Sequence, residues 1–480
     1  MRFVLRSLVL WLSVVFSAQG ELRLPAVFSD GAVLQRGDDV RIWGWAAPGA
    51  DVGLRVSWGE KEDTAQADPF GAFSFHFASP DNPGPHEIEL ASGDVTHTLV
   101  DLWFGEVWLC AGQSNMEMEV SAVVPPGSTR LQEAELPRLR VFDVEKAFAL
   151  HPEEQCEGKW QACTPSTALR FSAVATFFGQ SLLDELDVPI GLVTATWGGT
   201  IGEAWASAKA LRDFPECRQD LERLALLRGV PLSRKPLWLH PNRPGVIYNA
   251  MIAPLASGSQ RALSLRGVLW YQGESNRGRA RRYGVLLPAL IADWRRSFDA
   301  PELPFYFVQI APFAYLRDVG EAARLRDEQR RTLRIPNTGM AVTMDIGDPG
   351  NLHPTRKIAV GQRLARWALA RTYGREDVAY SGPLFKGWVR EEETLRLFFE
   401  HGGGLNTEGK TLEHFTLAGR DGIRHPAQAR VDGESVVVWR EGLEEPLEVW
   451  FGGGAADETS LFNAAGLPAA SFIGDGRDRL

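Results

Sequence analysis

Short stretches rich in apolar residues mark both ends of this chain, and in those near the N-terminus apolar and polar residues alternate or nearly so. They lie at 40–45, 52–56, 73–77 and 87–90 near the N-terminus and at 395–399, 436–439 and 447–450 near the C-terminus. Turn-forming residues, such as Pro48-Gly49, separate the N-terminal stretches. Short strands at this spacing predict a β-sandwich at the N-terminus, and the C-terminal pattern predicts a second β domain.

The middle of the chain has a different pattern, in which continuous apolar stretches alternate with amphipathic ones. Strands are predicted at 107–110, 140–144, 190–195, 265–271, 304–310 and 339–345, and helices at 172–186, 281–298, 321–333 and 355–373. This alternation is typical of a parallel sheet with helices on both faces. The fold class predicted for the middle is therefore α/β, with three layers in the order α/β/α.

The first residues have the pattern of a secretory signal peptide. Arg2 and Arg6 flank the start of a short apolar run at 8–16, and the small residues of a cleavage site follow at 17–20. A retained membrane anchor would need about 20 apolar residues. We therefore predict a signal peptide at 1–20, a secreted or periplasmic location, and no membrane association after cleavage.

The length of the chain indicates more than one domain, and its charge excludes some classes of partner. At 480 residues the chain is too long for one ordinary domain. The changes of pattern divide it into an N-terminal β-sandwich domain (21–100), an α/β domain (101–375) and a C-terminal β domain (376–480). The formal net charge of −10 and the pI near 5.5 argue against nucleic acid or an anionic membrane as a partner.

Four cysteines are present, and none has the spacing of a zinc site. Cys156 and Cys163 are close together in a polar segment and could pair in an oxidising compartment. Cys110 lies in a predicted core strand, so we expect it to be a small buried apolar residue.

Three predicted strands of the α/β domain are each followed by a loop of glycine and polar residues. The loops are Gly112-Gln113-Ser114-Asn115-Met116, Trp197-Gly198-Gly199-Thr200 and Gln272-Gly273-Glu274-Ser275-Asn276. Strand-to-helix turns commonly use such residues without any function. Functional sites of open α/β sheets, however, lie at the carboxyl ends of strands. Ser114 is therefore a candidate nucleophile, which needs a base and donors for an oxyanion.

The candidate base is His353, which lies in the loop 347–354 after a predicted strand and before a predicted helix. Of the nine histidines it is the one at a strand end of the α/β domain. A loop histidine at this position can take a proton from serine if a carboxylate or carbonyl orients its other nitrogen. A helix-capping role is the alternative.

These loops resemble the successive sequence blocks of the SGNH hydrolases and, more narrowly, of the sialate O-acetylesterase family. The resemblance rests on residues 112–116, 198–199, 271–276 and 347–354. Residues 24–30 and 33–36 resemble the opening β segment of that family, and 461–463 and 466–469 resemble its closing motif. The similarity thus covers almost the whole mature chain.

The resemblance implies an exported serine esterase that removes O-acetyl groups from sialic acid through an acetyl-enzyme. It implies neither a metal nor an organic cofactor, and its partner is an O-acetylated carbohydrate substrate. Ser114 would be the nucleophile, and His353 the general base and then the general acid. The N–H groups of Ser114 and Gly199 and the side chain of Gln272 would form the oxyanion hole. Glu274 would orient Gln272 or its loop.

The acid of the triad stays open. The wider SGNH pattern has Asp three residues before the histidine, where this chain has Gly350. Related esterases have it two residues before, where this chain has Asn351. Asp348 is our preferred candidate and Asp345 the other, whereas a backbone carbonyl in this place would give a Ser-His dyad.

Substrate contacts are predicted for Glu274, Asn276 and Trp205, whose indole could stack on a sugar ring. A cluster of basic residues follows the third loop, at Arg277, Arg279, Arg281 and Arg282. The simpler interpretation is a solvated helix start. The other is attraction of an acidic sugar, since a guanidinium pairs well with a carboxylate.

Two other functions stay open beside the sialate esterase. The same chemistry could act on acetylated plant polysaccharide, xylan or xyloglucan. The altered position of the triad acid also allows a carbohydrate-binding protein whose site has decayed. A P-loop pattern at 404–411 is interpreted as a chance match, because the segment after it is too short for the helix that the motif requires.

Overall fold

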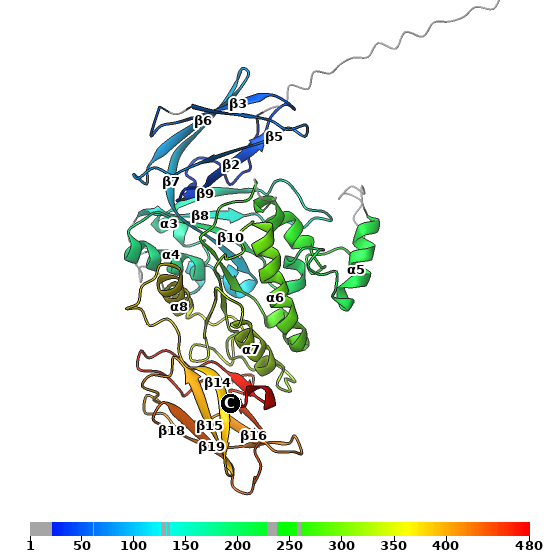
Figure 1. Cartoon of the computed structure of the whole chain (residues 1–480), viewed down its shortest axis with the longest axis vertical. Coiled ribbons are helices and arrows are strands. Elements are labelled where there is room, and N and C mark those ends of the chain that lie inside the picture. Colours follow the sequence, from blue (N-terminus) through cyan, green and yellow to red (C-terminus); the bar gives the residue numbers. More distant parts are fainter. Residues whose placement is uncertain (1–21, 61, 126–130, 132–134, 228–237, 257–260) are drawn as a thin grey trace, which may run out of the picture.

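The computed structural model of the chain describes residues 22–60, 62–125, 131, 135–227, 238–256 and 261–480. The predicted signal peptide lies outside these residues. Within them, no helix combines the length and the apolarity that a membrane crossing requires. A helix-covered middle part separates two β-rich parts at opposite ends of the molecule (Figure 1).

The N-terminal part consists of a separate two-stranded sheet and a group of strands that one long strand connects to the sheet of the middle part. Its strands are β1 (Val33–Gln35), β2 (Val40–Trp45), β3 (Asp51–Val56), β4 (Glu62–Gln66), β5 (Ala72–Phe77), β6 (His86–Ser92) and the start of β7 (Val95–Gly112). Strands β2 and β5 pair with each other, whereas β3, β4, β6 and β7 pair in a second group. Ile42 and Phe75 of the first group and Val52 and Leu90 of the second are buried in one apolar cluster.

Strand β7 is 18 residues long and belongs to both the N-terminal and the middle part. Its first half pairs with β6. Its second half pairs with β10 (Ile190–Thr196) on one side and β11 (Gly267–Tyr271) on the other. The domain boundary predicted between residues 100 and 101 therefore falls inside one continuous strand.

The central sheet has the strand order β13-β12-β11-β7-β10-β8-β9, with β7 in the middle. The remaining strands are β8 (Leu136–Val144), β9 (Gly158–Cys163), β12 (Phe305–Val308) and β13 (Thr338–Ala341). All neighbours along this order are parallel except β8 and β9, which are antiparallel. The carboxyl ends of the parallel strands consequently meet at one edge, where the predicted loops lie.

Helices cover both faces of this sheet. They are α1 (Ser114–Glu117), α3 (Pro165–Ala168), α4 (Ala173–Leu186), α5 (Pro215–Leu226), α6 (Ala280–Ser297), α7 (Glu321–Thr332) and α8 (Lys357–Trp367). Trp108 and Cys110 of β7 share an apolar cluster with α4 and α8, whereas Val107 and Leu109 share another with α6. Successive side chains of a strand point to opposite faces, so the predicted α/β class with three layers is confirmed.

The C-terminal part is a sandwich of two four-stranded sheets, β14-β15-β19-β18 and β17-β16-β20-β21. The strands are β14 (Leu384–Glu391), β15 (Thr394–Glu400), β16 (Phe415–Ala418), β17 (Arg424–Pro426), β18 (Gln428–Asp432), β19 (Ser435–Trp439), β20 (Glu448–Phe451) and β21 (Phe472–Gly474). Phe385 of one sheet stacks on Phe472 of the other, with ring centroids 4.1 Å apart. The P-loop pattern lies between β15 and β16, and a strand rather than a helix follows it.

Helix α7 attaches this sandwich to the middle part. Its fully buried Arg326 donates to three backbone carbonyls of the sandwich, those of Gly452, Gly454 and Ala455. The same helix also contacts the third predicted loop, because Gln329 Nε2 lies 3.3 Å from the carbonyl of Gln272. Helix α7 therefore contacts the C-terminal sandwich through Arg326 and the loop after β11 through Gln329.

The cysteines in the described part of the chain are all free thiols. The pairing considered for Cys156 and Cys163 does not occur in this structure. Cys110 is fully buried, as predicted. Burial also raises the pKa of its thiol, which keeps this sulfur protonated and unreactive.

Candidate active site

Ser114 stands at the carboxyl end of the central strand β7. Gly112 ends the strand with φ near +145°, and Gln113 leads directly into helix α1. A Cβ atom on Gly112 would lie 2.2 Å from the carbonyl oxygen of Tyr271 in β11. The neighbouring backbone therefore leaves room only for glycine, and the chain turns just before the serine.

His353 reaches Ser114 from the loop between β13 and α8. Its Nε2 atom lies 2.8 Å from the Ser114 Oγ atom, although the two residues are 239 positions apart in the sequence. Both side chains are half-buried, so solvent and ligands can reach them. The structure thus brings together the two residues proposed as nucleophile and base.

The surroundings of His353 favour its neutral form. Burial lowers the pKa of its imidazole, and the nearby positive charge of Lys357 lowers it further. The carboxylate of Glu117 acts in the opposite direction, but the pKa stays below its ordinary value. A neutral imidazole at neutral pH can accept a proton from serine.

The backbone N–H groups predicted to bind the oxyanion are those of Ser114 and Gly199. Within the described residues, the N–H groups of Ser114 and Gly199 donate to no other protein group. Gly198 lies against the serine, since a Cβ atom built on it would be 3.3 Å from the Ser114 Cβ atom. The Gly198 N–H itself donates to the Glu117 carboxylate, which fixes this loop against α1.

The structure encloses Gln272 and Asn276 among these loops, where they form hydrogen bonds with residues other than Ser114. Both are buried, and Gln272 Nε2 donates to Asn276 Oδ1 at 2.7 Å and to the Thr200 carbonyl at 3.2 Å. Asn276 in turn donates to Glu203 and accepts from the Gly202 N–H. This arrangement differs from the predicted oxyanion and substrate contacts, because the N–H groups of both amides already donate to other protein atoms.

No carboxylate of the described residues forms a hydrogen bond with the imidazole of His353. Asp348, the preferred triad acid, is exposed and accepts the Gly350 N–H at 2.9 Å. Asp345 forms a bidentate ion pair with Arg363. Asn351, which stands where related esterases have Asp, accepts the backbone N–H of His353 at 2.9 Å.

A buried polar network lies beside the Ser114–His353 pair. Asn115 is its centre: its Oδ1 accepts from Lys357 Nζ at 2.6 Å, and its Nδ2 donates to Glu274 Oε1 at 2.6 Å. Burial raises the pKa of Glu274, although Asn115 and Lys357 both act to lower it. Burial likewise lowers the pKa of Lys357 to about 8, although Glu274 acts to raise it.

Three of the four arginines that follow the third loop form ion pairs. Arg277 pairs with Asp318 and Glu321, Arg279 with Glu203, and Arg282 with Glu216. A guanidinium that already has a carboxylate partner is less available for the carboxylate of a sugar. This supports the simpler interpretation of the cluster.

Trp205 is fully buried and belongs to the apolar core. Its Nε1 atom donates to Thr200 Oγ1 at 3.0 Å, and its ring lies edge-on to Trp270, with centroids 5.9 Å apart. It therefore supports the Gly199 loop from inside and presents no face to a sugar. Trp197, which is half-buried beside the same loop, is the more accessible indole.

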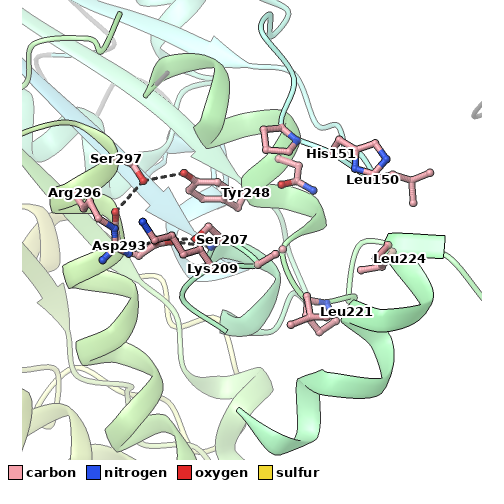
Figure 2. Close-up of a pocket in the computed structure, with 16 residues that line it drawn as sticks. Leu150, His151, Ser207, Lys209, Leu221, Leu224, Tyr248, Asp293, Arg296 and Ser297 are labelled. Atoms are coloured by element: carbon pink, nitrogen blue, oxygen red, sulfur yellow. Dashed lines mark hydrogen bonds and ion pairs between the residues drawn. The ribbon is translucent and has the colours of Figure 1, made fainter. Parts of the chain in front are cut away.

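A cavity of about 430 Å³ lies outside this site, between α5, α6 and the loop at 150–152 (Figure 2). Asp293 at its wall accepts hydrogen bonds from the N–H and the hydroxyl of Ser207, and Tyr248 contacts Ser297. Neither Ser114 nor His353 lines this cavity. Its volume alone does not make it the place of chemistry.

Sequence reasoning missed Lys357 and Glu117. Lys357 carries a readable signal: it shares the apolar helix face of Val360 and Leu364 at helical spacing, where an unpaired lysine would be costly. Glu117 carries only a weaker one, its position three residues after the serine. The environment of both residues is created by loops that are distant in the sequence.

The chain is similar to known proteins over most of its length. Residues 105–370 match the family model described as carbohydrate esterase, sialic acid-specific acetylesterase. The human sialate O-acetylesterase is 30% identical over 413 residues, which cover 78% of this chain and 76% of that protein. The mouse sialate O-acetylesterase is 31% identical over 402 residues, which cover 72% of each chain.

A solved structure is similar over nearly the full length. It is described as a novel carbohydrate acetylesterase from Xanthomonas citri and is 34% identical to this chain, with a TM-score of 0.83. The match covers 95% of this chain and 100% of that one.

Proposed function

Because this chain belongs to the carbohydrate esterase family of sialic acid-specific acetylesterases, it is a carboxylic ester hydrolase, and we propose that it removes O-acetyl groups from carbohydrate by a Ser-His mechanism. The observation that carries the mechanism is the 2.8 Å contact between Ser114 Oγ and His353 Nε2 at the end of the central strand. We also propose that the chain is exported after cleavage of residues 1–20.

In the first half of the reaction, Ser114 Oγ attacks the acetyl carbonyl carbon while His353 takes the hydroxyl proton. The oxyanion that forms accepts hydrogen bonds from the N–H groups of Ser114 and Gly199. Such donors typically contribute about 100- to 1000-fold each to the rate. The tetrahedral intermediate then collapses, and the imidazolium gives its proton to the departing sugar oxygen.

In the second half, water attacks the acetyl-enzyme. His353 takes a proton from this water, the hydroxide oxygen bonds to the acetyl carbon, and the same oxyanion donors act again. Collapse of this intermediate returns the proton from His353 to Ser114 Oγ and releases acetic acid, which loses its own proton to solvent and becomes acetate. No step requires a group other than those present in the chain and water.

The substrate class is the finer part of the proposal. The curated relatives are sialate O-acetylesterases, and O-acetylated sialic acid is accordingly our first candidate. The ion pairs of Arg277, Arg279 and Arg282 favour a second candidate, an uncharged acetylated polysaccharide such as xylan or xyloglucan, because these three guanidinium groups already have carboxylate partners.

The test is acetate release by the mature protein from O-acetylated sialic acid and from acetylated xylo-oligosaccharides in parallel. Ser114→Ala is expected to reduce kcat on either substrate by about 10⁴- to 10⁶-fold, since the nucleophile is lost. Unchanged turnover in this variant contradicts the serine mechanism. No turnover by the wild-type protein on either substrate favours a decayed, carbohydrate-binding site.

A further inference from the structure

Lys357 is a fully buried lysine at the first position of α8, four residues after His353. Its ammonium donates to Asn115 Oδ1 at 2.6 Å and to the carbonyl of Pro354 at 2.7 Å. The same ammonium lies 5.5 Å from the centroid of the Tyr271 ring. Burying this charge is costly unless it is paired and hydrogen-bonded, so its position calls for an explanation.

Through these two hydrogen bonds, Lys357 is linked to the residues that come directly before and directly after His353 in the chain. Pro354, whose carbonyl it holds directly, follows His353 in the chain. Leu352, whose carbonyl accepts from Asn115 Nδ2 at 3.2 Å, precedes His353. Asn115 thus accepts a hydrogen bond from Lys357 through its Oδ1 atom and donates one to the His353 segment through its Nδ2 atom.

We propose that Lys357, acting through Asn115 and the Pro354 carbonyl, is the positioning residue that holds His353 against Ser114 in place of the carboxylate of a Ser-His-Asp triad. This inference rests on the proposed function and deepens it. Fixing the carbonyls before and after His353 leaves only the side-chain torsions of the imidazole free. The Asn351 side chain, which accepts the His353 N–H, fixes the same segment from a third direction.

Lys357 also acts on His353 through its charge. The charged groups that act on the imidazole are Lys357 on α8, which lowers its pKa, and Glu117 on α1, which raises it. The groups that face Lys357 itself are Glu274, from the loop after β11, and the ring of Tyr271. Removal of the ammonium therefore raises the pKa of His353, because its repulsion of the imidazolium is lost.

The experiment compares Lys357→Met, which keeps the length of the side chain and removes its charge, with Arg356→Met. Arg356 is the exposed neighbour of Lys357. Its replacement removes the same positive charge at a position whose side chain does not donate to Asn115 or Pro354. We expect kcat on p-nitrophenyl acetate to fall about 100-fold in Lys357→Met, since a small misplacement of the base costs this much. We expect little change in KM, and a shift of the acid limb of kcat/KM to higher pH. Arg356→Met is expected to keep the wild-type values.

Titration of the His353 imidazole by NMR gives a readout that needs no turnover. Its signal is assigned by its loss in His353→Asn. In the wild-type protein the signal is expected to move a second time as Lys357 loses its proton at a pH of about 8. This second step is expected to be absent in Lys357→Arg, because arginine keeps its proton.

The outcomes separate the two proposals. A folded Lys357→Met protein with wild-type kcat and an unshifted acid limb overturns the positioning role and leaves the esterase intact. If Lys357→Met does not fold, Asn115→Ala takes its place, because it removes the link from Lys357 to the Leu352 carbonyl; wild-type kcat in a folded Asn115→Ala protein overturns the positioning role. A wild-type protein that hydrolyses no ester, but whose His353 signal shows the second step, loses the proposed function and keeps only the effect of the Lys357 charge on His353.

Discussion

Gly112 determines where the nucleophile can stand. Its φ lies in a region that side chains rarely adopt, and a Cβ atom would meet the Tyr271 carbonyl at 2.2 Å. The obstacle is backbone of the adjacent strand, which cannot move without breaking the pairing of β7 with β11.

Gly112→Ala is therefore expected to lower the free energy of unfolding by about 1–3 kcal/mol for backbone strain alone. It is also expected to displace Ser114 and reduce kcat. Chemical denaturation and acetate release measure the two effects. Gly278→Ala, at a glycine with open space around it, is the matched control. An alanine variant at 112 with wild-type stability would show that the two strands can separate at no cost.

The lowered pKa of His353 determines in which direction the acid limb of the kcat/KM profile is shifted. The base acts in its neutral form, so kcat/KM falls only when the imidazole becomes protonated. Burial and Lys357 disfavour this protonation. The acid limb is therefore expected below the ordinary histidine value of about 6.5. A limb at or above that value in a pH-rate profile contradicts this expectation.

At the residue scale, sequence reasoning succeeded where the signal is local. Ser114 and His353 each follow a recognisable strand, and the fold brings them to one edge of the sheet. Gln272 and Trp205 also lie near strand ends, but sequence cannot show whether such a side chain points to solvent or is enclosed by other loops. Lys357 was missed because its partners Asn115 and Glu274 come from distant segments.

At the scale of elements, α7 depends on Arg326. This guanidinium is fully buried and serves three carbonyls of the C-terminal sandwich. Burial lowers its pKa to about 10, so it still carries its charge at neutral pH. The same helix contacts the loop after β11 through Gln329. We therefore expect the position of that loop to depend on the contacts of Arg326 with the sandwich.

Arg326→Ala is expected to lower the free energy of unfolding by about 3 kcal/mol or more, because buried carbonyls lose their donors. Arg334→Ala, an exposed arginine just after the same helix, is expected to have little effect. Denaturant unfolding of both variants makes the comparison. Equal stability would mean that the sandwich and α7 do not depend on this contact.

The helices and strands of the middle part were largely predictable, because apolar periodicity is a local property. The helix expected at 281–298 is Ala280–Ser297 in the structure. The helix expected at 355–373 begins at Lys357 and ends in a π-helical turn at Ala368–Thr372. The continuity of β7 was not predictable. Its exposed first half and buried second half have different patterns, although the backbone is one strand.

At the scale of the whole molecule, Glu106 joins the N-terminal part to the middle part. Its buried carboxylate accepts from Arg36 at 2.6 Å, from Arg266 at 2.5 Å and from the Tyr373 hydroxyl at 3.2 Å. Burial acts to raise the pKa of Glu106, but Arg266 and Arg36 outweigh it and hold the pKa below its ordinary value.

A lowered pKa stabilises the folded state above the unfolded value, and this stabilisation is lost as the pH falls through the folded value. Glu106→Gln is expected to cost about 1–3 kcal/mol at neutral pH. The difference from the wild-type protein should shrink below a pH of about 4. Urea unfolding of both proteins at neutral pH and at a pH below about 4 measures this difference in stability. A pH-independent difference would assign the effect to shape rather than charge.

Export is the remaining prediction at this scale. When the chain is expressed with residues 1–20, we expect the protein to be found outside the cytoplasm. Its first residue is then expected to be Glu21, because the cleavage pattern ends at Gly20. Intact mass of the purified protein measures the start. A chain that keeps Met1, or that stays in the cytoplasm, contradicts the prediction.

The central position of β7 also has a consequence in time. The ribosome completes β7 and Ser114 early, whereas the strands on either side of β7 and the loop of His353 follow as much as 239 residues later. Pairing between such distant segments is slow. A nascent chain, or one held unfolded for transport, therefore carries its serine without a base. Ester hydrolysis begins only when the last of these segments has arrived, so the order of synthesis delays activity until the protein is essentially complete.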